Sequence, residues 1–310
     1  MKIEQPPYFH SNGKVLLTGE YFVLQGAKSL AMPIKTGQSL LQLQNTAGSG
    51  VEWITRYQGK EVLTLKFSET LEIEACRPKE FNTDFLLRLL QAARAMNPEK
   101  WAQLNGSCLI ADIEFAHNWG LGSSSSLISN IAWLFNLDPF RLHFAVSNGS
   151  GYDIACARSK QAIIYQLFDK QPIIKETTFC PDFHNELYFV YLGQKQDSAA
   201  EVSRFLKHKT VSPQDIQTIG ELTEAFLQAA SGSELGRVIR EHEKLLSSHL
   251  GMKPVKQQYF SGFEGDIKSL GAWGGDLALV CWNQGEERLR SYFAGKNLHQ
   301  LMRFNELISC

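Results

Sequence analysis

The stretch HNWGLGSSSSL, residues 117–127, places two glycines around a leucine and follows them with four consecutive serines. The apolar run CLIADIEF before it predicts a strand, and Leu127, Ile131 and Leu134 recur after it at helical spacing. The order is therefore strand, glycine turn and helix. The first N–H groups of a helix lack partners and carry partial positive charge, and glycines admit a close approach. This stretch therefore predicts an anion-binding turn.

The same stretch also fits a serine-capped helix after an ordinary glycine turn, and taken alone it leaves both interpretations open. Three named motifs are excluded. A P-loop requires a lysine after its second glycine, and none follows here. A dinucleotide fold requires an acidic residue at the end of the next strand, but Asp138 lies in NLDPF, which we interpret as a helix end. The HRD and DFG motifs of protein kinases are absent.

The composition is that of an ordinary globular protein, with 310 residues, 44% hydrophobic and 20% charged, and a formal net charge of −1. We therefore expect neither a nucleic acid nor a membrane as partner, because no overall positive field attracts one. The start of the chain lacks the apolar run of a signal peptide, and no run approaches the roughly 18 apolar residues of a membrane span. The six cysteines include no C-x-x-C pair, which favours a reducing cytoplasm over a disulfide framework or zinc.

Periodicity along the rest of the chain predicts an α+β fold. Alternating apolar residues predict strands at 51–57 and 61–67, and the run 81–100 predicts a helix opened by Asn82 or Thr83 and closed before its proline. After residue 180 the sequence becomes rich in helical patterns, followed by a final strand, helix and strand. The three long helices are predicted at 198–208, 212–230 and 233–251.

Three further stretches change the interpretation of the glycine–serine run. GKVLLTGEYFVLQGA contains Lys14, GSGYDIA contains Asp153 after a flexible turn, and GAWGGD is a glycine turn that runs into a strand. Together with GLGSSSS, and in this order, they resemble the motifs of the GHMP kinases, the family of galactokinase, homoserine kinase, mevalonate kinase and phosphomevalonate kinase. GSGYDIA and GAWGGD are most similar to the phosphomevalonate kinase branch. The resemblance covers residues 11–281.

The resemblance implies a GHMP-kinase-like two-part fold with mixed β-sheets and helices. Residues 1–175 would form the N-terminal domain, and residues 176–310 a ferredoxin-like C-terminal domain. ATP and Mg²⁺ are the implied cofactors. The implied catalytic residues are Asp153, which accepts the proton of the acceptor hydroxyl, and Lys14, which keeps that carboxylate ionised.

Ligand-binding residues are implied by the same motifs. Ser124 aligns with the serine that contacts magnesium, and Ser125 also fits a purely structural place at the helix start. The implied ATP-binding residues are Gly120, Leu121, Gly122, Ser123, Ser124 and Ser125. The implied substrate-binding residues are Lys195, Ser198, Gly271, Gly274 and Gly275. Further candidate cations for an acidic acceptor are His10, Arg158 and Lys268.

Three positions depart from the family pattern. Asn118 stands where motif 2 usually has its first glycine, and Leu142 stands where mevalonate kinases place a magnesium-binding glutamate. Leu142 therefore argues against a standard mevalonate kinase. Trp273 replaces a glycine of motif 3, where we expect it to crowd the turn or to floor the acceptor pocket.

The implied function is ATP-dependent phosphoryl transfer to a hydroxyl or phosphate of a small acidic metabolite of the isoprenoid pathway. Phosphomevalonate is the first expected acceptor and mevalonate the second. Two alternatives stay open: the related ATP-dependent decarboxylase of mevalonate diphosphate, and a non-catalytic homologue that binds a metabolite. Retention of both Lys14 and Asp153 argues against the non-catalytic alternative. The expected partner is a small molecule, the expected location is the cytoplasm, and a homodimer stays open.

Overall fold

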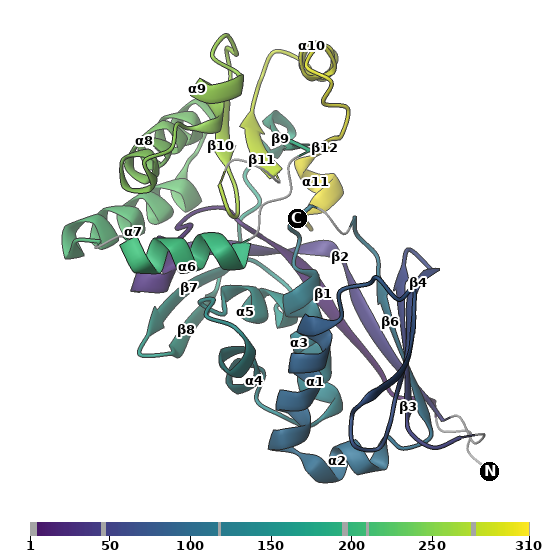
Figure 1. The fold of residues 1–310 in the computed structure, drawn as a ribbon. Coiled ribbons are helices and arrows are strands. Elements are labelled where there is room, and N and C mark those ends of the chain that lie inside the picture. Colours follow the sequence, from purple (N-terminus) through teal and green to yellow (C-terminus); the bar gives the residue numbers. More distant parts are fainter. Residues whose placement is uncertain are drawn as a thin grey trace. The chain divides into compact units, whose positions relative to one another are not determined.

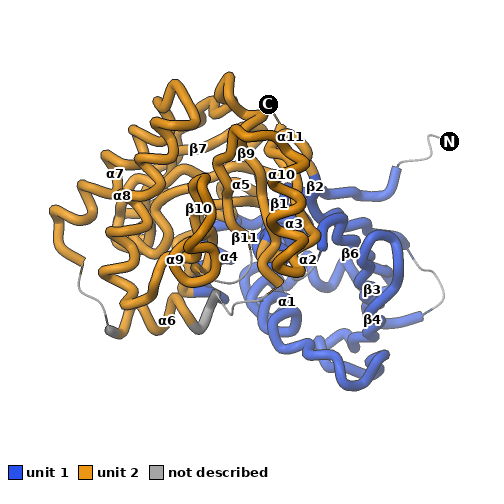
Figure 2. The backbone as a smooth tube through the Cα atoms, turned by 90° about the horizontal axis from the view of Figure 1, so that it is seen from above, with its two compact units in different colours: residues 1–13, 36–117, 121–147 blue, residues 14–35, 118–120, 148–310 orange. Residues whose placement is uncertain are grey.

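The computed structural model describes residues 5–44, 48–116, 119–193, 198–208, 211–273 and 277–309 (Figure 1). The chain divides into two compact units, which Figure 2 shows in different colours. The first consists of residues 1–13, 36–117 and 121–147, and the second of residues 14–35, 118–120 and 148–310. The units interleave along the chain because strands β1 (Tyr8–Leu16) and β2 (Ser29–Gln44) each begin in one unit and end in the other.

The first unit is built on a mixed sheet with the strand order β5-β4-β3-β6-β2. β3 and β6 pair in parallel, whereas the other neighbours in this order pair antiparallel. Besides β1 and β2, its strands are β3 (Val51–Tyr57), β4 (Lys60–Phe67), β5 (Ile73–Arg77) and β6 (Ser107–Ile113). Its helices are α1 (Asp84–Met96), α2 (Pro98–Gln103), α3 (Ser123–Leu134) and α4 (Pro139–Val146).

The boundaries of α1 follow from its sequence as predicted. The Asn82 side chain accepts a hydrogen bond from the N–H of Asp84 at 2.9 Å, where the helix begins. Leu86, Leu89, Leu90 and Ala93 form the buried face of the helix. Pro98 follows the end of this helix and is the first residue of α2. Proline has no N–H to donate, but the N–H of a first helical residue has no partner within the helix, so nothing is lost at this position. The predicted helix is confirmed.

The segment NLDPF ends one helix and starts the next. α3 ends at Leu134, Asn136 has a left-handed φ of 53°, and the N–H of Leu137 donates to the carbonyl of Ala132 at 2.8 Å. The Asp138 side chain accepts a hydrogen bond from the N–H of Arg141 at 2.7 Å and caps α4, and Pro139 is its first residue. Our interpretation of this segment as a helix end is therefore confirmed, but we did not predict the helix that starts at Pro139. An aspartate before a proline is a favourable helix start, so this second signal was present in the sequence.

The second unit contains an antiparallel sheet with the strand order β10-β11-β9-β12. Along the chain the order is strand, helices, two strands, helix and strand. Within the sheet, the first of these strands, β9, lies between the third, β11, and the fourth, β12. This arrangement is ferredoxin-like, which confirms the predicted fold class. The strands are β9 (Leu187–Tyr191), β10 (Asp266–Ser269), β11 (Leu277–Cys281) and β12 (Leu301–Arg303). The helices after β9 are α6 (Ser198–His208), α7 (Pro213–Gln228), α8 (Gly232–Leu250), α9 (Val255–Tyr259), α10 (Glu286–Ala294) and α11 (Phe304–Leu307).

The three long helices predicted after residue 180 are present as α6, α7 and α8. The hydroxyl oxygens of Ser212 and Ser231 cap α7 and α8 by accepting hydrogen bonds from N–H groups three residues on, at 3.1 and 3.2 Å. α7 and α8 lie side by side (Figure 1). The other elements of this unit are η1 (Phe22–Gln25), α5 (Tyr152–Arg158), β7 (Ile163–Phe168), β8 (Gln171–Glu176) and η2 (His184–Glu186).

Three expectations about the whole chain have different outcomes. The division into consecutive domains at residue 175 stays a prediction. The two compact units divide the chain differently, because residues 14–35 belong to the second unit. Among the described residues, no helix has both the length and the apolar character needed to span a membrane. Cysteines 76, 108, 156 and 281 are free thiols, whereas Cys180 is disulfide-bonded. The cytoplasmic location stays a prediction.

Candidate active site

Lys14 links two of the sequence motifs within the second unit. It lies near the end of β1, and its side chain is half-buried. Its Nζ atom donates a hydrogen bond to the carbonyl oxygen of Gly120 at 2.9 Å. The same ammonium group lies over the ring of Tyr152, 5.4 Å from the ring centroid, where the quadrupole of an aromatic face attracts a cation. Lys14 therefore connects the glycine turn of GLGSSSS with GSGYDIA.

The charges around Lys14 keep it protonated. Burial alone would lower the pKa of Lys14, because it removes water from the ammonium group. The electrostatic interactions of the ammonium group with Tyr152 and Asp153 act in the opposite direction and outweigh burial, so the pKa of Lys14 lies above its ordinary value. The pKa of the Tyr152 hydroxyl is also raised, chiefly by burial. Near pH 7 the site therefore holds a lysine cation and a neutral phenol beside Asp153.

Asp153 is placed by the turn that precedes α5. Gly151 has a φ of 85°, a left-handed conformation that favours glycine, and Asp153 follows in the first turn of the helix. The Tyr165 hydroxyl donates a hydrogen bond to the Ser150 carbonyl and anchors this turn. The Oδ1 atom of Asp153 accepts a hydrogen bond from the N–H of Ile154 at 3.1 Å. The structure thus brings the two expected catalytic residues, Lys14 and Asp153, into electrostatic contact within one unit.

The start of α3 has the features of an anion-binding helix end. Gly122, at the N-cap, has a φ of 100°, and Gly120 has a φ of 68°. Both values require the conformational freedom of glycine. The first turn holds no acidic residue that would offset the positive end of the helix dipole. Ser124 is exposed and Ser123 is half-buried.

The later serines of the run serve the helix itself. The hydroxyl of Ser125 donates to the carbonyl of Gly122 at 3.0 Å, and that of Ser126 lies 2.8 Å from Oε1 of Gln38. Both serines are buried, as is Leu121. Of the four hydroxyls, those of Ser123 and Ser124 are therefore better placed for a ligand. The ATP-binding roles of this run, Ser125 and Leu121 included, stay predictions.

The residues expected to bind the acceptor are only partly described. Lys195, Gly274 and Gly275 lie outside the described residues. Ser198 is the first residue of α6. Gly271 has a φ of 63°, and a Cβ atom there would meet no atom within 4 Å. Its backbone conformation therefore favours glycine, while the space beside it is open.

Two expectations about side chains near motif 3 are wrong. Lys268, a further candidate cation for the acceptor, is fully buried, and its Nζ donates to Oε1 of Glu20. Trp273 does not floor an acceptor pocket, because its side chain is 1% exposed and packs in an apolar core with Tyr21 and Phe22. Its φ of 58° lies in the left-handed region that favours glycine.

The other candidates are less informative. His10 lies 3.4 Å from Oε2 of Glu114 in the first unit, which already provides its ring with a carboxylate neighbour. Leu142, at the position of the mevalonate kinase glutamate, is fully buried in α4. Arg158 is the last residue of α5.

The sequence analysis did not identify two aromatic residues near Lys14 and Gly120, namely Tyr152 and Trp119. The only feature of the sequence that could have indicated Tyr152 is its position next to Asp153 in GSGYD. Trp119, next to Gly120, stacks on Tyr191 with ring centroids 5.4 Å apart. Nothing in the local sequence predicts this pair, because its members come from distant parts of the chain.

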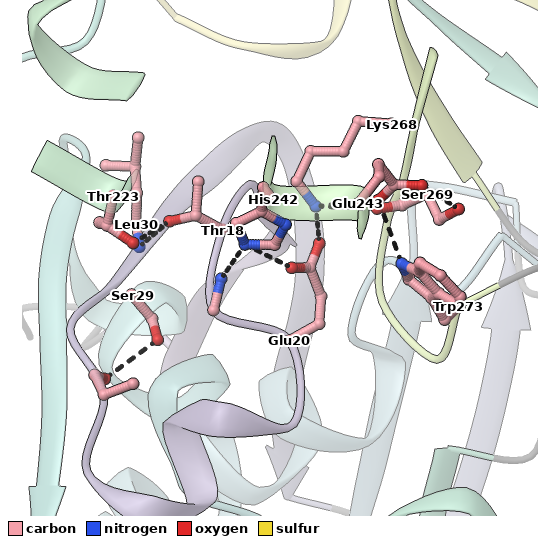
Figure 3. A network of polar contacts seen from close by, with 12 residues as sticks. Thr18, Glu20, Ser29, Leu30, Thr223, His242, Glu243, Lys268, Ser269 and Trp273 are labelled. Carbon is pink, nitrogen blue, oxygen red and sulfur yellow. Dashed lines mark hydrogen bonds and ion pairs between the residues drawn. The ribbon is translucent and has the colours of Figure 1, made fainter. Parts of the chain in front are cut away.

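Motifs 1 and 3 are joined by buried polar contacts, which Figure 3 shows from close by. Glu20 of GEY and Lys268 point toward one another and form an ion pair with both side chains fully buried. Burial raises the pKa of Glu20, and the Lys268 ammonium offsets part of this rise. The Tyr21 hydroxyl donates to the carbonyl of Ala272 at 2.8 Å. The turn of motif 3 is therefore held directly by motif 1.

Comparisons of the sequence give no match: no family model matches this chain, and neither does any curated protein. Solved structures do match over nearly the whole chain. Phosphomevalonate kinase from Streptococcus pneumoniae, in complex with phosphomevalonate and AMPPNP, is 19% identical with a TM-score of 0.68, and 96% of this chain covers 99% of that one.

Two further structures are similar. Mevalonate kinase from Methanococcus jannaschii is 15% identical with a TM-score of 0.65, covering 97% of this chain and 98% of that one. The Lin0012 protein from Listeria innocua is 16% identical with a TM-score of 0.69, covering 95% and 96%. The GHMP kinases that the motifs resemble are thus among the structural neighbours, and this chain has the fold of phosphomevalonate and mevalonate kinases.

Proposed function

We propose that this protein is an ATP- and Mg²⁺-dependent kinase that transfers a phosphoryl group to phosphomevalonate, with mevalonate as the second candidate acceptor. The observation that carries the proposal is the interaction of Lys14 with Asp153, next to the carbonyl of Gly120. The fold similarity supports it, since the Streptococcus pneumoniae enzyme was solved with phosphomevalonate and AMPPNP.

Asp153 is the group that would accept a proton from the acceptor. Its carboxylate is half-buried at the start of α5. Lys14 interacts with it electrostatically. A cation beside a carboxylate favours the ionised form that a general base requires. Lys14 is itself held in place by Gly120 and by the ring of Tyr152. Asp153 would then act as the base while Lys14 holds its charge state.

The start of α3 would bind the phosphates of ATP. The N–H groups of a first helical turn, a helix dipole without a carboxylate in that turn and the exposed hydroxyl of Ser124 are the features that polyphosphate requires. Binding there would use the backbone of Gly122 and Ser123. Phosphoryl transfer depends mostly on such positioning and charge neutralisation.

The residues that the structure describes fit a magnesium ion held mainly by phosphates. They include no cluster of three or more histidine, cysteine or acidic side chains that would hold a metal by itself. Mg²⁺ commonly uses only one or two protein ligands together with phosphate oxygens, and Ser124 offers one. Bound there, the ion would neutralise charge on the β- and γ-phosphates.

A direct assay tests the proposal. The purified protein is incubated with Mg-ATP and, separately, with phosphomevalonate, mevalonate, galactose and homoserine, and ADP and product masses are followed. We expect ADP that depends on phosphomevalonate, and a product heavier by one phosphoryl group. Asp153→Asn should lower the turnover by about 10²-fold or more, as loss of a general base does. Asp182→Asn, at an exposed aspartate, is the matched control and should leave the rate unchanged.

Other results would redirect the proposal. Release of carbon dioxide with phosphate from mevalonate diphosphate would identify a decarboxylase instead. Nucleotide or metabolite binding without turnover of any acceptor would indicate a non-catalytic homologue. Equal rates for Asp153→Asn and the wild-type protein would remove Asp153 as the base.

A further inference from the structure

The turn of motif 3 is held on both sides by one carboxylate. Ser269, the last residue of β10, donates from its hydroxyl to Oε2 of Glu243 at 2.9 Å. Trp273, four residues later, donates from Nε1 to Oε1 of the same side chain at 3.2 Å. Figure 3 shows Ser269 and Trp273 pointing toward Glu243 from opposite ends of this turn. The carboxylate therefore bridges the ends of the segment that contains Gly271 and Ala272.

The tryptophan makes this bridge possible where the related motif has glycine. A glycine could take the same left-handed backbone conformation, but it has no side chain to reach α8. Trp273 takes that conformation, with a φ of 58°, and buries its ring with Phe205, Ile219 and Leu246. A positive φ carries an energetic penalty for a non-glycine residue, so the surrounding contacts must outweigh it.

Glu243 is itself fixed in place. It is 3% exposed, and Nζ of Lys268 lies 3.9 Å from its Oε1. Lys268 is bound to Glu20, and the Tyr21 hydroxyl holds the carbonyl of Ala272. A buried carboxylate between two donors and a cation is satisfied on both oxygens, so it can restrain the turn without moving.

We propose that Glu243, through Trp273 and Ser269, is a positioning residue that fixes the motif 3 turn for the acceptor. This inference rests on the proposed function, because it takes Gly271 as part of the acceptor site. Glu243 is buried and would touch neither substrate. Loosening the turn should therefore weaken the use of the acceptor and leave nucleotide binding unchanged.

Two variants and two matched controls test this inference in the full-length protein. Glu243→Gln keeps the shape but loses one acceptor oxygen and the charge, and Trp273→Phe keeps an aromatic ring but removes the N–H donor. Glu241→Gln is the control on the exposed side of α8. Trp282→Phe is the second control, because its Nε1 donates to Gly285 at 2.8 Å, outside this turn.

The kinetic expectation is specific. At about pH 8.5, above the pKa of about 7 where Glu243 is ionised, both test variants should raise the KM for the acceptor about tenfold, the effect of losing a charged hydrogen bond. The kcat and the Kd for nucleotide should stay within about twofold of wild type. Both controls should match wild type. Unchanged KM values in folded Glu243→Gln and Trp273→Phe would overturn the inference while leaving the kinase proposal intact. No turnover by the wild-type protein would overturn the proposed function, and the inference with it.

A spectroscopic signal checks the contact without relying on activity. Burial raises the pKa of Glu243 to about 7, against the opposing effect of Lys268 and with a further rise from Glu20. His242, next to Glu243, stays neutral because burial lowers its pKa. The indole N–H resonance of Trp273 should therefore shift with pH near neutrality in wild type and stop shifting in Glu243→Gln. A wild-type resonance that is insensitive to pH from about 5.5 to about 8.5 would contradict a Glu243 carboxyl that titrates near neutrality beside the indole.

Discussion

At the scale of single residues, Gly19 illustrates how one position can combine two demands. Its φ is 83°, and a Cβ atom there would lie 2.0 Å from Oγ, 2.7 Å from Cβ and 3.1 Å from Cα of Ser29. Rotation of the serine side chain can relieve only the first of these contacts. The N–H of Gly19 also donates a hydrogen bond to Nε2 of His242 at 3.1 Å. Both the backbone and the neighbouring strand therefore require glycine.

We expect Gly19→Ala to lower the free energy of unfolding by about 3 kcal/mol, from the positive φ and the steric overlap together. Urea unfolding followed by circular dichroism measures this. Gly59→Ala is the matched control, because Gly59 has a φ of 76° but no atom within 4 Å of the added Cβ. It should lose only about 1 kcal/mol. Equal losses in the two variants would show that Ser29 yields without cost.

Glu243 should make stability depend on pH. Its pKa is raised from 4.5 to about 7 in the folded state, so between these values the folded protein binds a proton that the unfolded chain has lost. This contribution to stability is complete below pH 4.5 and is lost as the pH rises through about 7. Over that window it amounts to about 3 kcal/mol.

Unfolding of Glu243→Gln at about pH 5 and about pH 7.5, near the two ends of this window, tests this contribution. The free energy of unfolding should fall less between these values in Glu243→Gln than in wild type. Glu241→Gln should fall as wild type does. A steeper fall in Glu243→Gln than in wild type would contradict the raised pKa.

How far the sequence predicts single residues depends on where their partners lie. Lys14, Asp153 and the glycines were predictable, because short motifs carry their local chemistry. Lys268 was misread as a substrate cation, since its partner Glu20 lies 248 positions away in the chain. Trp273 was misread for the same reason: Glu243 and the core around Phe205 cannot be deduced from GAWGGD alone.

At the scale of elements, α3 separates structural serines from candidate ligand-binding ones. Ser126 is fully buried beside Gln38, which is itself 1% exposed, whereas Ser124 is exposed. We expect Ser126→Ala to cost about 1–3 kcal/mol of stability, because Oε1 of Gln38 loses a buried donor. Ser124→Ala should leave stability within about 0.5 kcal/mol of wild type but weaken the binding of Mg-ATP.

Thermal unfolding and calorimetric titration with Mg-AMPPNP together check this pair of variants. The expected pattern is a lower Tm for Ser126→Ala and a higher nucleotide Kd for Ser124→Ala. The reverse pattern would mean that Ser124 faces the interior and Ser126 the ligand. Loss of both properties in both variants would show that the serine run acts as one unit.

Elements with strong periodicity were predicted well, and short ones were not. α1, α7 and α8 each bury a regular apolar face, so their positions could be deduced from spacing. α2 and α4 have six and eight residues, too few for a clear period, and both begin at a proline that we took as a break. The serine run could be placed on a helix, but its division into buried and exposed hydroxyls depends on Gln38 in β2.

At the scale of the whole molecule, the compact units do not follow the order of the chain. The second unit takes residues 14–35 from the N-terminal part and combines them with residues 148–310. This early segment supplies partners for buried polar groups of the later one. Thr18 lies 2.8 Å from the hydroxyl of Thr223, Gly19 donates to His242, and Glu20 pairs with Lys268. Local signals in the sequence, such as the change in character after residue 180, do not reveal these distant contacts.

The fragment 176–310 should therefore fail to fold by itself, although it contains all four strands of the ferredoxin-like sheet. Without residues 14–35, the buried Lys268 has lost its Glu20 partner, which alone costs about 3–5 kcal/mol. The core around Trp273 also loses Tyr21 and Phe22, two of its large side chains. These losses together approach the whole stability of a domain of ordinary size.

A comparison of two shortened proteins by circular dichroism and urea unfolding tests this expectation. The fragment 176–310 should lack a near-ultraviolet signal and a cooperative transition. A longer protein, in which a flexible linker joins residues 14–35 to residues 148–310, should regain both, because it restores the partners of Lys268 and His242. Cooperative unfolding of the shorter fragment would instead support consecutive domains divided at residue 175, and would mean that the buried contacts with residues 14–35 contribute little to stability.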